Sequence, residues 1–300
     1  MRFILACLAA TISFWTPAHA EGRETLGFGR MFSNDYFGDG SDRWQTASST
    51  LSYVRGRAPY SGNEAFGDLL EFQLRGQIIS PSNHAPAPGD RPYVGALSFG
   101  VATHFEMGGT DLSLGAGVTA IGPQTGLSAF QTNFHEAFEI PGPRFVDDEL
   151  GDDVFFNANA AATRVMRLSD HTTVRPFVEA HFGTEDLVRA GADVLIGTAA
   201  QSDLLLRDVV TGQLYRGTIG DDAGVSLLLG ADTAKVFDSA FLPSETGYNV
   251  SETRTRARAG VFAQYSTKLS GFYGVTYLSP EFEGQHEGQY VGSLRINFSF

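Results

Sequence analysis

Apolar and polar residues alternate in short segments along most of the chain, and this pattern constrains the fold more than any other feature. The final segment, GQYVGSLRINFSF, puts five apolar side chains on one face of an extended strand: Tyr290, Leu294, Ile296, Phe298 and Phe300. Its polar side chains fall on the opposite face: Gln289, Ser293, Arg295, Asn297 and Ser299. A membrane-barrel strand needs this alternation, because lipid covers one face and a polar lumen the other.

A soluble β-sandwich could also end on one alternating strand, so the recurrence of the pattern matters more. The segments LLEFQLRGQI and DLSLGAGVTAI alternate in the same way, and TRTRARAGVFAQY puts Arg254, Arg256 and Arg258 on one face. Three arginines are hard to place in a sandwich core but suit a polar lumen. We interpret them as interior charge balance rather than a substrate site. The terminal Phe300 resembles the end signature of bacterial outer-membrane barrels.

Counting such segments predicts an all-β fold, a 12-stranded antiparallel transmembrane β-barrel of the bacterial outer membrane. Single-chain bacterial barrels have an even number of strands. The expected strands lie near 25–34, 44–57, 67–79, 92–106, 110–121, 152–167, 173–184, 187–199, 224–236, 252–267, 269–279 and 288–300. No linker divides the chain, so residues 21–300 are expected to form one domain.

Two segments stand apart from this strand pattern. With both chain ends in the periplasm, the longest loop, 122–151, would lie on the outer side of the membrane. The segment 199–223 would then be a long periplasmic connection, and its LLLRDVV stretch suggests a short helix or a piece packed under the barrel mouth.

The first 20 residues read as a cleaved secretory signal, with one Arg, an apolar stretch and small residues at Ala18 and Ala20. Cys7 follows too few residues for a lipoprotein signal, and no cysteine remains after it. Disulfides and thiolate chemistry are therefore excluded from the mature chain. Removing Arg2 leaves 20 basic against 34 acidic residues, a net charge of −14. Nucleic acid is an unsuitable partner for such a chain, whereas divalent cations suit it.

Possible site residues cluster at the expected outer rim. Asn34 and Asp35 end the first strand, and Thr46 opens the second after a loop of Gly, Asp and Ser. These residue types also suit a plain turn. In the 122–151 loop, Gln131 and His135 are four apart and would share one face of a helical turn. A histidine can act as a general base near neutral pH.

Four stretches in this order resemble the outer-membrane lipid A 3′-O-deacylase family. They are ND at 34–35 with DRWQT at 42–46, SPSNHAPAPGDRPYVG at 80–95, IGPQTG with QTNFH at 121–135, and SPEFEGQHEGQYVGSLRINFSF at 279–300. The likeness spans almost all of the mature chain and is poor over 199–251. It implies a twelve-stranded barrel that removes the 3′-linked acyloxyacyl chain from the lipid A of lipopolysaccharide.

The resemblance also implies roles for individual residues. Asn34 and Asp35 match the catalytic Asn-Asp pair of the family, Thr46 its Thr, His135 its loop base, and Gln131 a Gln four residues before that base. His135 would activate water, and a Ca²⁺ ion held partly by Asp35 would stabilise the oxyanion. Hard oxygen ligands of this kind suit calcium.

The chain departs from the family at two positions. Pro141 stands where the family has a functional Glu, so Glu139, or Glu136 instead, is the expected second calcium ligand. The family also uses a Lys in the loop after the third strand, near Pro86 here, and this loop has none. Arg91 is a candidate for binding a lipid A phosphate, with a rim charge as the alternative.

Two other functions stay open at this stage. The same rim could serve an outer-membrane phospholipase, although NFHEAF offers no serine beside the histidine. A non-catalytic barrel is the second alternative, either a small anion pore or a structural surface protein. The expected partners are lipid A and outer-membrane lipid, and the expected state is a monomer.

Overall fold

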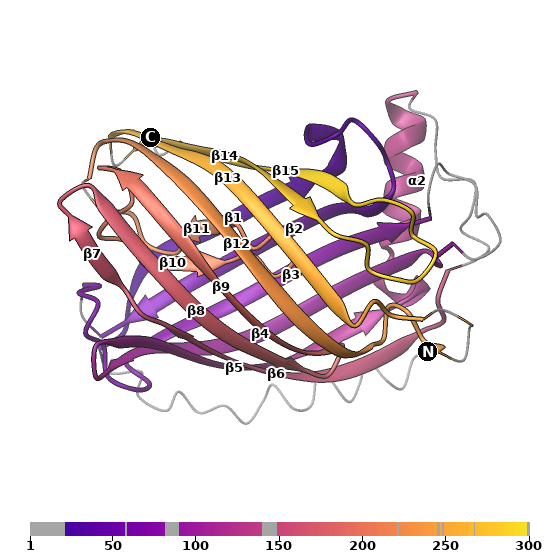
Figure 1. Ribbon diagram of the computed structural model, residues 1–300, viewed down its shortest axis with the longest axis horizontal. Coiled ribbons are helices and arrows are strands. Elements are labelled where there is room, and N and C mark those ends of the chain that lie inside the picture. The colour runs from indigo at the N-terminus through magenta and orange to yellow at the C-terminus, as the bar shows by residue number, and fades with distance from the viewer. Residues whose placement is uncertain are drawn as a thin grey trace.

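Twelve long strands form one closed antiparallel barrel in the computed structural model (Figure 1). The structure describes residues 22–57, 59–81, 90–139, 149–220, 222–244, 247, 249–266 and 268–298. The barrel strands are β1 (Glu24–Asn34), β2 (Trp44–Gly56), β3 (Leu69–Ser80), β4 (Val94–Met107), β5 (Thr110–Ile121), β6 (Asp153–Thr163), β8 (Thr172–Phe182), β9 (Glu185–Gly197), β12 (Gly224–Ser239), β13 (Thr253–Ser266), β14 (Leu269–Leu278) and β15 (Gln289–Phe298). The predicted fold class is confirmed, whereas the predicted signal segment and Phe300 lie outside the described residues.

Each barrel strand pairs with its neighbours in the chain, and pairing of β1 with β15 closes the ring. One predicted strand, 152–167, is wrong in extent, because β6 ends at Thr163 and the short β7 (Met166–Ser169) pairs separately with β8. The last β6–β8 pair is Thr163 with Phe177, so Pro176 stands opposite the next residue, Arg164. A proline cannot donate a ladder hydrogen bond, which explains why the regular pairing stops there.

The alternation of the sequence becomes the two faces of the wall. On β13, the arginines at 254, 256 and 258 are buried in the lumen while Thr255, Ala257 and Val261 are exposed outside. The arginines meet carboxylates: Arg254 Nη1 lies 2.7 Å from Glu185 and Arg256 Nε lies 2.9 Å from Asp232. The interpretation as interior charge balance is confirmed.

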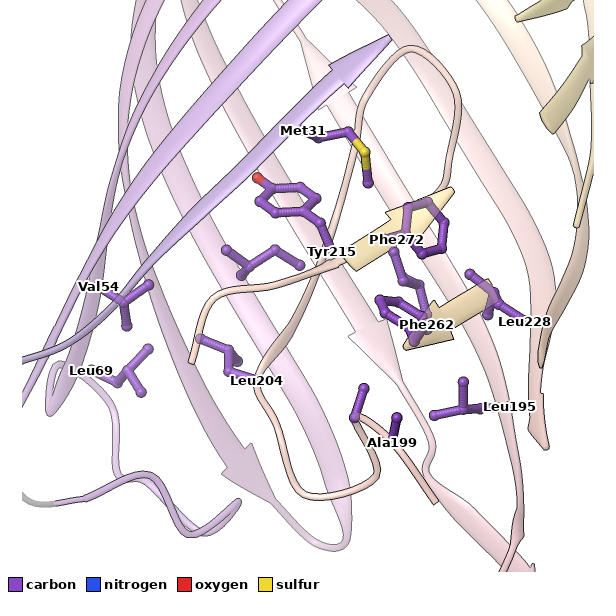
Figure 2. Close-up of a cluster of buried hydrophobic side chains, with 13 residues drawn as sticks. Met31, Val54, Leu69, Leu195, Ala199, Leu204, Tyr215, Leu228, Phe262 and Phe272 are labelled. Atoms are coloured by element: carbon purple, nitrogen blue, oxygen red, sulfur yellow. The ribbon is translucent and has the colours of Figure 1, made fainter. Parts of the chain in front are cut away.

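The segment 199–223 is neither a helix nor a plain connection. It enters the lumen as a small hairpin of β10 (Leu205–Arg207) and β11 (Leu214–Arg216). Figure 2 shows Tyr215 of this segment beside Met31, and Leu204 belongs to the same cluster of buried side chains, which also includes Phe272 of the wall. Leu204 and Leu206 of LLLRDVV belong to this interior cluster, so the expectation of a short helix is wrong, and the stretch packs inside the barrel.

Polar bonds tie the hairpin segment to opposite sides of the wall. Arg207 Nη2 lies 2.7 Å from Asp193 on β9, and Asp208 accepts a 3.3 Å hydrogen bond from Thr50 on β2. Gln213 Nε2 donates to Val275 O on β14 at 3.2 Å. A cavity of about 290 Å³ remains beside the hairpin. A lumen crossed in this way is poorly suited to an open anion pore.

In the described part of the chain, no helix is long and apolar enough to cross a membrane. The main helix, α2 (Leu127–Ala137), stands beside one end of the barrel in Figure 1.

Replacing Asp232 by alanine should destabilise the barrel strongly. Its carboxylate meets Arg189 at 3.1 Å and Arg256 at 2.9 Å, and it also contacts Arg258, so its removal takes one carboxylate from three buried arginines. Breaking a buried ion pair typically costs about 3–5 kcal/mol. Urea unfolding in detergent should show this loss for Asp232→Ala, with the exposed Asp238→Ala as control. Equal midpoints for the two variants would contradict a structural role for the network.

Candidate active site on the outer wall

Helix α2 is seated on the outer, lipid-side face of the barrel. On β4, Leu97 and Phe99 are 40% and 50% exposed, and Gly95 shares their face. A Cβ atom on Gly95 would lie 3.1 Å from Leu127 Cβ and 2.8 Å from Thr125 Oγ1. Only glycine leaves room for so close an approach. The helix therefore covers the wall beside the mouth instead of the lumen.

Gln131 and His135 lie on the buried face of α2, as their spacing predicts. The Tyr93 hydroxyl, just before β4, donates to Gln131 Oε1 at 2.7 Å, and both side chains are buried. His135 is 8% exposed, and its Nε2 lies 3.7 Å from Asp42 Oδ2 in the loop after β1. The histidine thus joins α2 to that loop.

Asn34 and Asp35 form the turn into this loop, as residue types of this kind suggest. Asn34 Oδ1 accepts from the backbone N–H of Tyr36 at 2.9 Å and so caps the short 3-10 helix η2 (Asp35–Phe37). The Asp35 carbonyl accepts from the N–H groups of Gly38 and Asp39 at 2.8 and 3.0 Å. This winding buries Asp35 to 1% exposure beneath the loop.

The Asp35 carboxyl is an unusual group for an ordinary turn. Its pKa is raised to about 8, mainly by burial and in part by the nearby Asp42 and Asp39 carboxylates. A hydrogen bond from the Arg43 N–H at 2.6 Å acts in the opposite direction but does not compensate. A buried carboxylate beside two others is an electrostatic arrangement that a divalent cation would relieve.

Thr46 lies at a β-bulge that the sequence did not reveal. The pairing of β2 with β3 shifts between Gln45 and Ala47, which leaves Thr46 as the extra residue. Its hydroxyl is 2.6 Å from that of Ser80, while the Gln45 side chain donates to Glu281 at 2.9 Å. Bulges re-aim side chains at barrel rims, and here the bulge sends two adjacent residues to different partners.

Three predicted residues are placed away from this group. Glu136 and Glu139 are exposed on and beyond the end of α2, without a contact to Asp35. In the described ranges, no three His, Cys, Asp or Glu side chains are placed to hold a metal together. Arg91 is 1% exposed and its guanidinium pairs with Glu281, so it points at a carboxylate within the protein. Pro86 and Pro141 lie outside the described residues.

Two residues of the site were present in quoted motifs but received no role from the sequence. Asp42 belongs to DRWQT and Tyr93 to RPYVG. Each residue contacts α2 from a distant part of the chain, Asp42 from the loop after β1 and Tyr93 from just before β4. The spacing of neighbouring residues in the sequence does not indicate such contacts. Asp42 is the carboxylate partner of His135, and Tyr93 is the anchor of Gln131.

Three phenylalanines line an exposed face of α2 beside His135. Phe130, Phe134 and Phe138 are 61%, 45% and 65% exposed, and they repeat at every fourth position. Their rings contact one another, with centroids 6.2 and 4.7 Å apart, and Phe134 lies 6.3 Å from the His135 ring. This apolar surface adjoins the buried polar face of the same helix.

The sequence model of the family described as outer membrane protein LpxR matches residues 3–300. The chain belongs to the LpxR family. It is therefore an outer membrane protein of a lipid A deacylase family, as the motifs predicted. No curated protein sequence matches the chain.

A solved structure of the same family shows the same fold. LpxR from Salmonella typhimurium superimposes with a TM-score of 0.74 at 18% identity, over 91% of this chain and 100% of that one. The KdgM porin gives a TM-score of 0.44 at 5% identity, over 92% of this chain and 99% of that one. The translocator domain of the autotransporter NalP from Neisseria meningitidis gives a TM-score of 0.42 at 10% identity, over 99% of this chain and 95% of that one.

Tyr93→Phe should loosen α2 without altering the barrel. The change leaves the buried Gln131 amide without its partner, which typically costs about 1–3 kcal/mol. Amide hydrogen exchange should show a lower free energy of opening for α2, while exchange in β13 stays unchanged. The exposed Tyr265→Phe, on β13 and far from α2, is the matched control. Unchanged protection of α2 would show that the Tyr93 bond does not hold the helix.

Proposed function

We propose that this protein hydrolyses the 3′-linked acyloxyacyl ester of lipid A in the outer leaflet, with His135 as general base. The observation that carries the proposal is the placement of His135 on the outer wall, where α2 meets the 35–43 loop and exposed aromatic rings adjoin it. A lipid can reach this position from the membrane without entering the lumen.

The roles of the surrounding residues follow from their contacts. Asp42 lies close enough to His135 Nε2 to orient the ring and to favour its protonated form once a proton is taken from water. The 3.7 Å separation is of the kind that tightens when substrate binds. Asn34 and Thr46 supply the other wall of the site, and Gln131 holds α2 to Tyr93 so that His135, one turn on, keeps its place.

Calcium fits the acidic loop in part. Asp35 offers a carboxyl group whose pKa is raised by burial and by the neighbouring Asp42 carboxylate. We propose these two as the protein carboxylates of a calcium site, with water and backbone oxygens completing it. Glu139, the second ligand that the family resemblance implies, is exposed beyond the end of α2. When bound, calcium would supply positive charge for the developing oxyanion.

The aromatic surface supports a substrate with acyl chains. Exposed rings at 130, 134 and 138 give α2 a continuous apolar side at the height of the site. Adjoining apolar patches of this kind mark binding or membrane surfaces.

His135→Ala should abolish deacylation while the barrel stays folded. Loss of a general base typically lowers the rate ~10²–10⁴-fold. The measurement is release of the 3′-linked chain from lipid A in mixed micelles that also contain phospholipid. His171→Ala, a histidine exposed on the β7–β8 turn, is the control. Wild-type rates for His135→Ala would refute the base assignment, and release from phospholipid alone would favour the phospholipase alternative.

Calcium affinity should rise with pH up to about pH 8. In the metal-free protein Asp35 holds a proton below its pKa of about 8. Calcium must displace this proton, so affinity should grow about tenfold per pH unit in that range. Calorimetric titration with Ca²⁺ at pH 6 and pH 8 tests this.

Asp35→Asn should remove both the calcium binding and its pH dependence, whereas the exposed Asp170→Asn should retain them. Retention of tight calcium binding by Asp35→Asn would exclude Asp35 as a ligand. Full activity in excess chelator would exclude a calcium role in the reaction altogether.

A further inference from the structure

Arg30 is a cation on the lipid-side face of the barrel. Its neighbours Gly29 and Met31 face the lumen, since Met31 is 1% exposed in the interior cluster and a Cβ on Gly29 would meet the Tyr215 ring. Arg30 alternates with them and is exposed, together with Phe28 and Phe32 at 57% and 41%. The guanidinium therefore points out of the barrel.

The surroundings of Arg30 are apolar. Its partner across the β1–β2 ladder is Leu51, which is 50% exposed, and Ile296 on β15 is also 50% exposed on the outer face. The described contacts of Arg30 include no ion pair. A charged side chain on the lipid face of a barrel costs stability, most of all near the bilayer midplane. A phosphate of a bound lipid would offset that cost.

The position of Arg30 links it to the site. Two segments cover the outer wall on either side of β1 and β2. Next to β1, η2 lies over β15. There a Cβ on Gly292 would collide with the Phe37 carbonyl, which accepts a hydrogen bond from the Tyr273 hydroxyl at 2.9 Å. Next to β2, α2 lies over β3 and β4. The outer face of β1 and β2 between them is open to lipid.

Along this open face, Arg30 is four residues from Asn34 on the same side of β1. At ~3.3 Å per residue this is about 13 Å along a tilted strand. A long arginine side chain can turn its charged end toward the membrane surface while its stem stays among apolar groups. Its guanidinium can therefore lie a little below the level of the ester-cleaving residues, within the span of one lipid A headgroup.

We propose that Arg30 binds a phosphate group of the lipid substrate and so sets the position of the substrate on the outer face of β1 and β2. The inference rests on the proposed function, because lipid A is the phosphorylated lipid that the site would cleave. Guanidinium groups bind phosphate through paired charge-assisted hydrogen bonds. Arg91 is buried against Glu281, and Arg43 in the 35–43 loop pairs with Asp39 and Glu287, so both are directed at carboxylates of the protein, whereas Arg30 faces lipid.

The test compares wild type, Arg30→Met and Arg30→Lys on lipid A with its phosphates and on lipid A freed of them. Methionine removes the charge from a lipid-facing position and should not impair folding. Arg30→Met should lower kcat/KM on phosphorylated lipid A by roughly 10- to 100-fold, mainly through KM, and Arg30→Lys should restore part of it. On phosphate-free lipid A the three proteins should be equal.

Lys235→Met is the matched control, because Lys235 is also exposed on the outer face but pairs with Glu252 on the far side of the barrel from α2. A second measurement, binding of phosphorylated lipid A to His135→Ala with and without Arg30→Met, needs no catalysis. Weaker binding in the double variant would support the role of Arg30, whether or not the wild-type protein releases an acyl chain. Absence of acyl-chain release by the wild-type protein would refute the proposed function and not the role of Arg30. Equal binding, or an equal loss of activity on both substrates, would overturn the role of Arg30.

Discussion

The closing ladder between β1 and β15 is the contact on which the rest of the molecule depends. In lipid, backbone N–H and C=O groups have no water to bond, so a sheet can cross only when its edges pair. Here Phe32, Ser33 and Asn34 pair with Leu294, Ser293 and Gly292. This ladder ends at Asn34, the residue before Asp35, and η2 then folds back over β15 at Gly292. Closure of the barrel and construction of the site therefore share one set of backbone bonds.

A lumen filled by the chain itself is consistent with the candidate site on the outer wall. Arg256 and Arg258 meet Asp232 and Asp193, and the β10–β11 hairpin binds walls on opposite sides. With the interior committed to structure, the outer wall is the surface that a lipid can reach. Glycine at position 95 lets α2 lie on that wall, and the helix brings a buried histidine and an exposed aromatic face to the same level.

Much of this could be predicted from the sequence, because alternation in a barrel is a local property. The strands, the lumenal arginines and the shared face of Gln131 and His135 all follow from a period of two or of about four residues. The hairpin in the lumen could not be predicted, since the polar and apolar residues of 199–223 satisfy partners from four distant strands. The bulge at Thr46 and the pairing of Asp42 with His135 likewise arise from contacts far apart in the chain. Assignment of Arg91 to a lipid phosphate stays a prediction, and its pairing with Glu281 directs attention to Arg30 instead.

The central claim is that the outer wall beneath α2 is the place where lipid A loses its 3′-linked chain. The most direct measurement is a mass spectrum of lipid A extracted from a Gram-negative host that expresses this chain in its outer membrane. The account predicts a new lipid A species lighter by the 3′-linked acyloxyacyl group, with both phosphates retained. Lipid A of unchanged mass, at confirmed abundance of the folded barrel in the outer membrane, would contradict it.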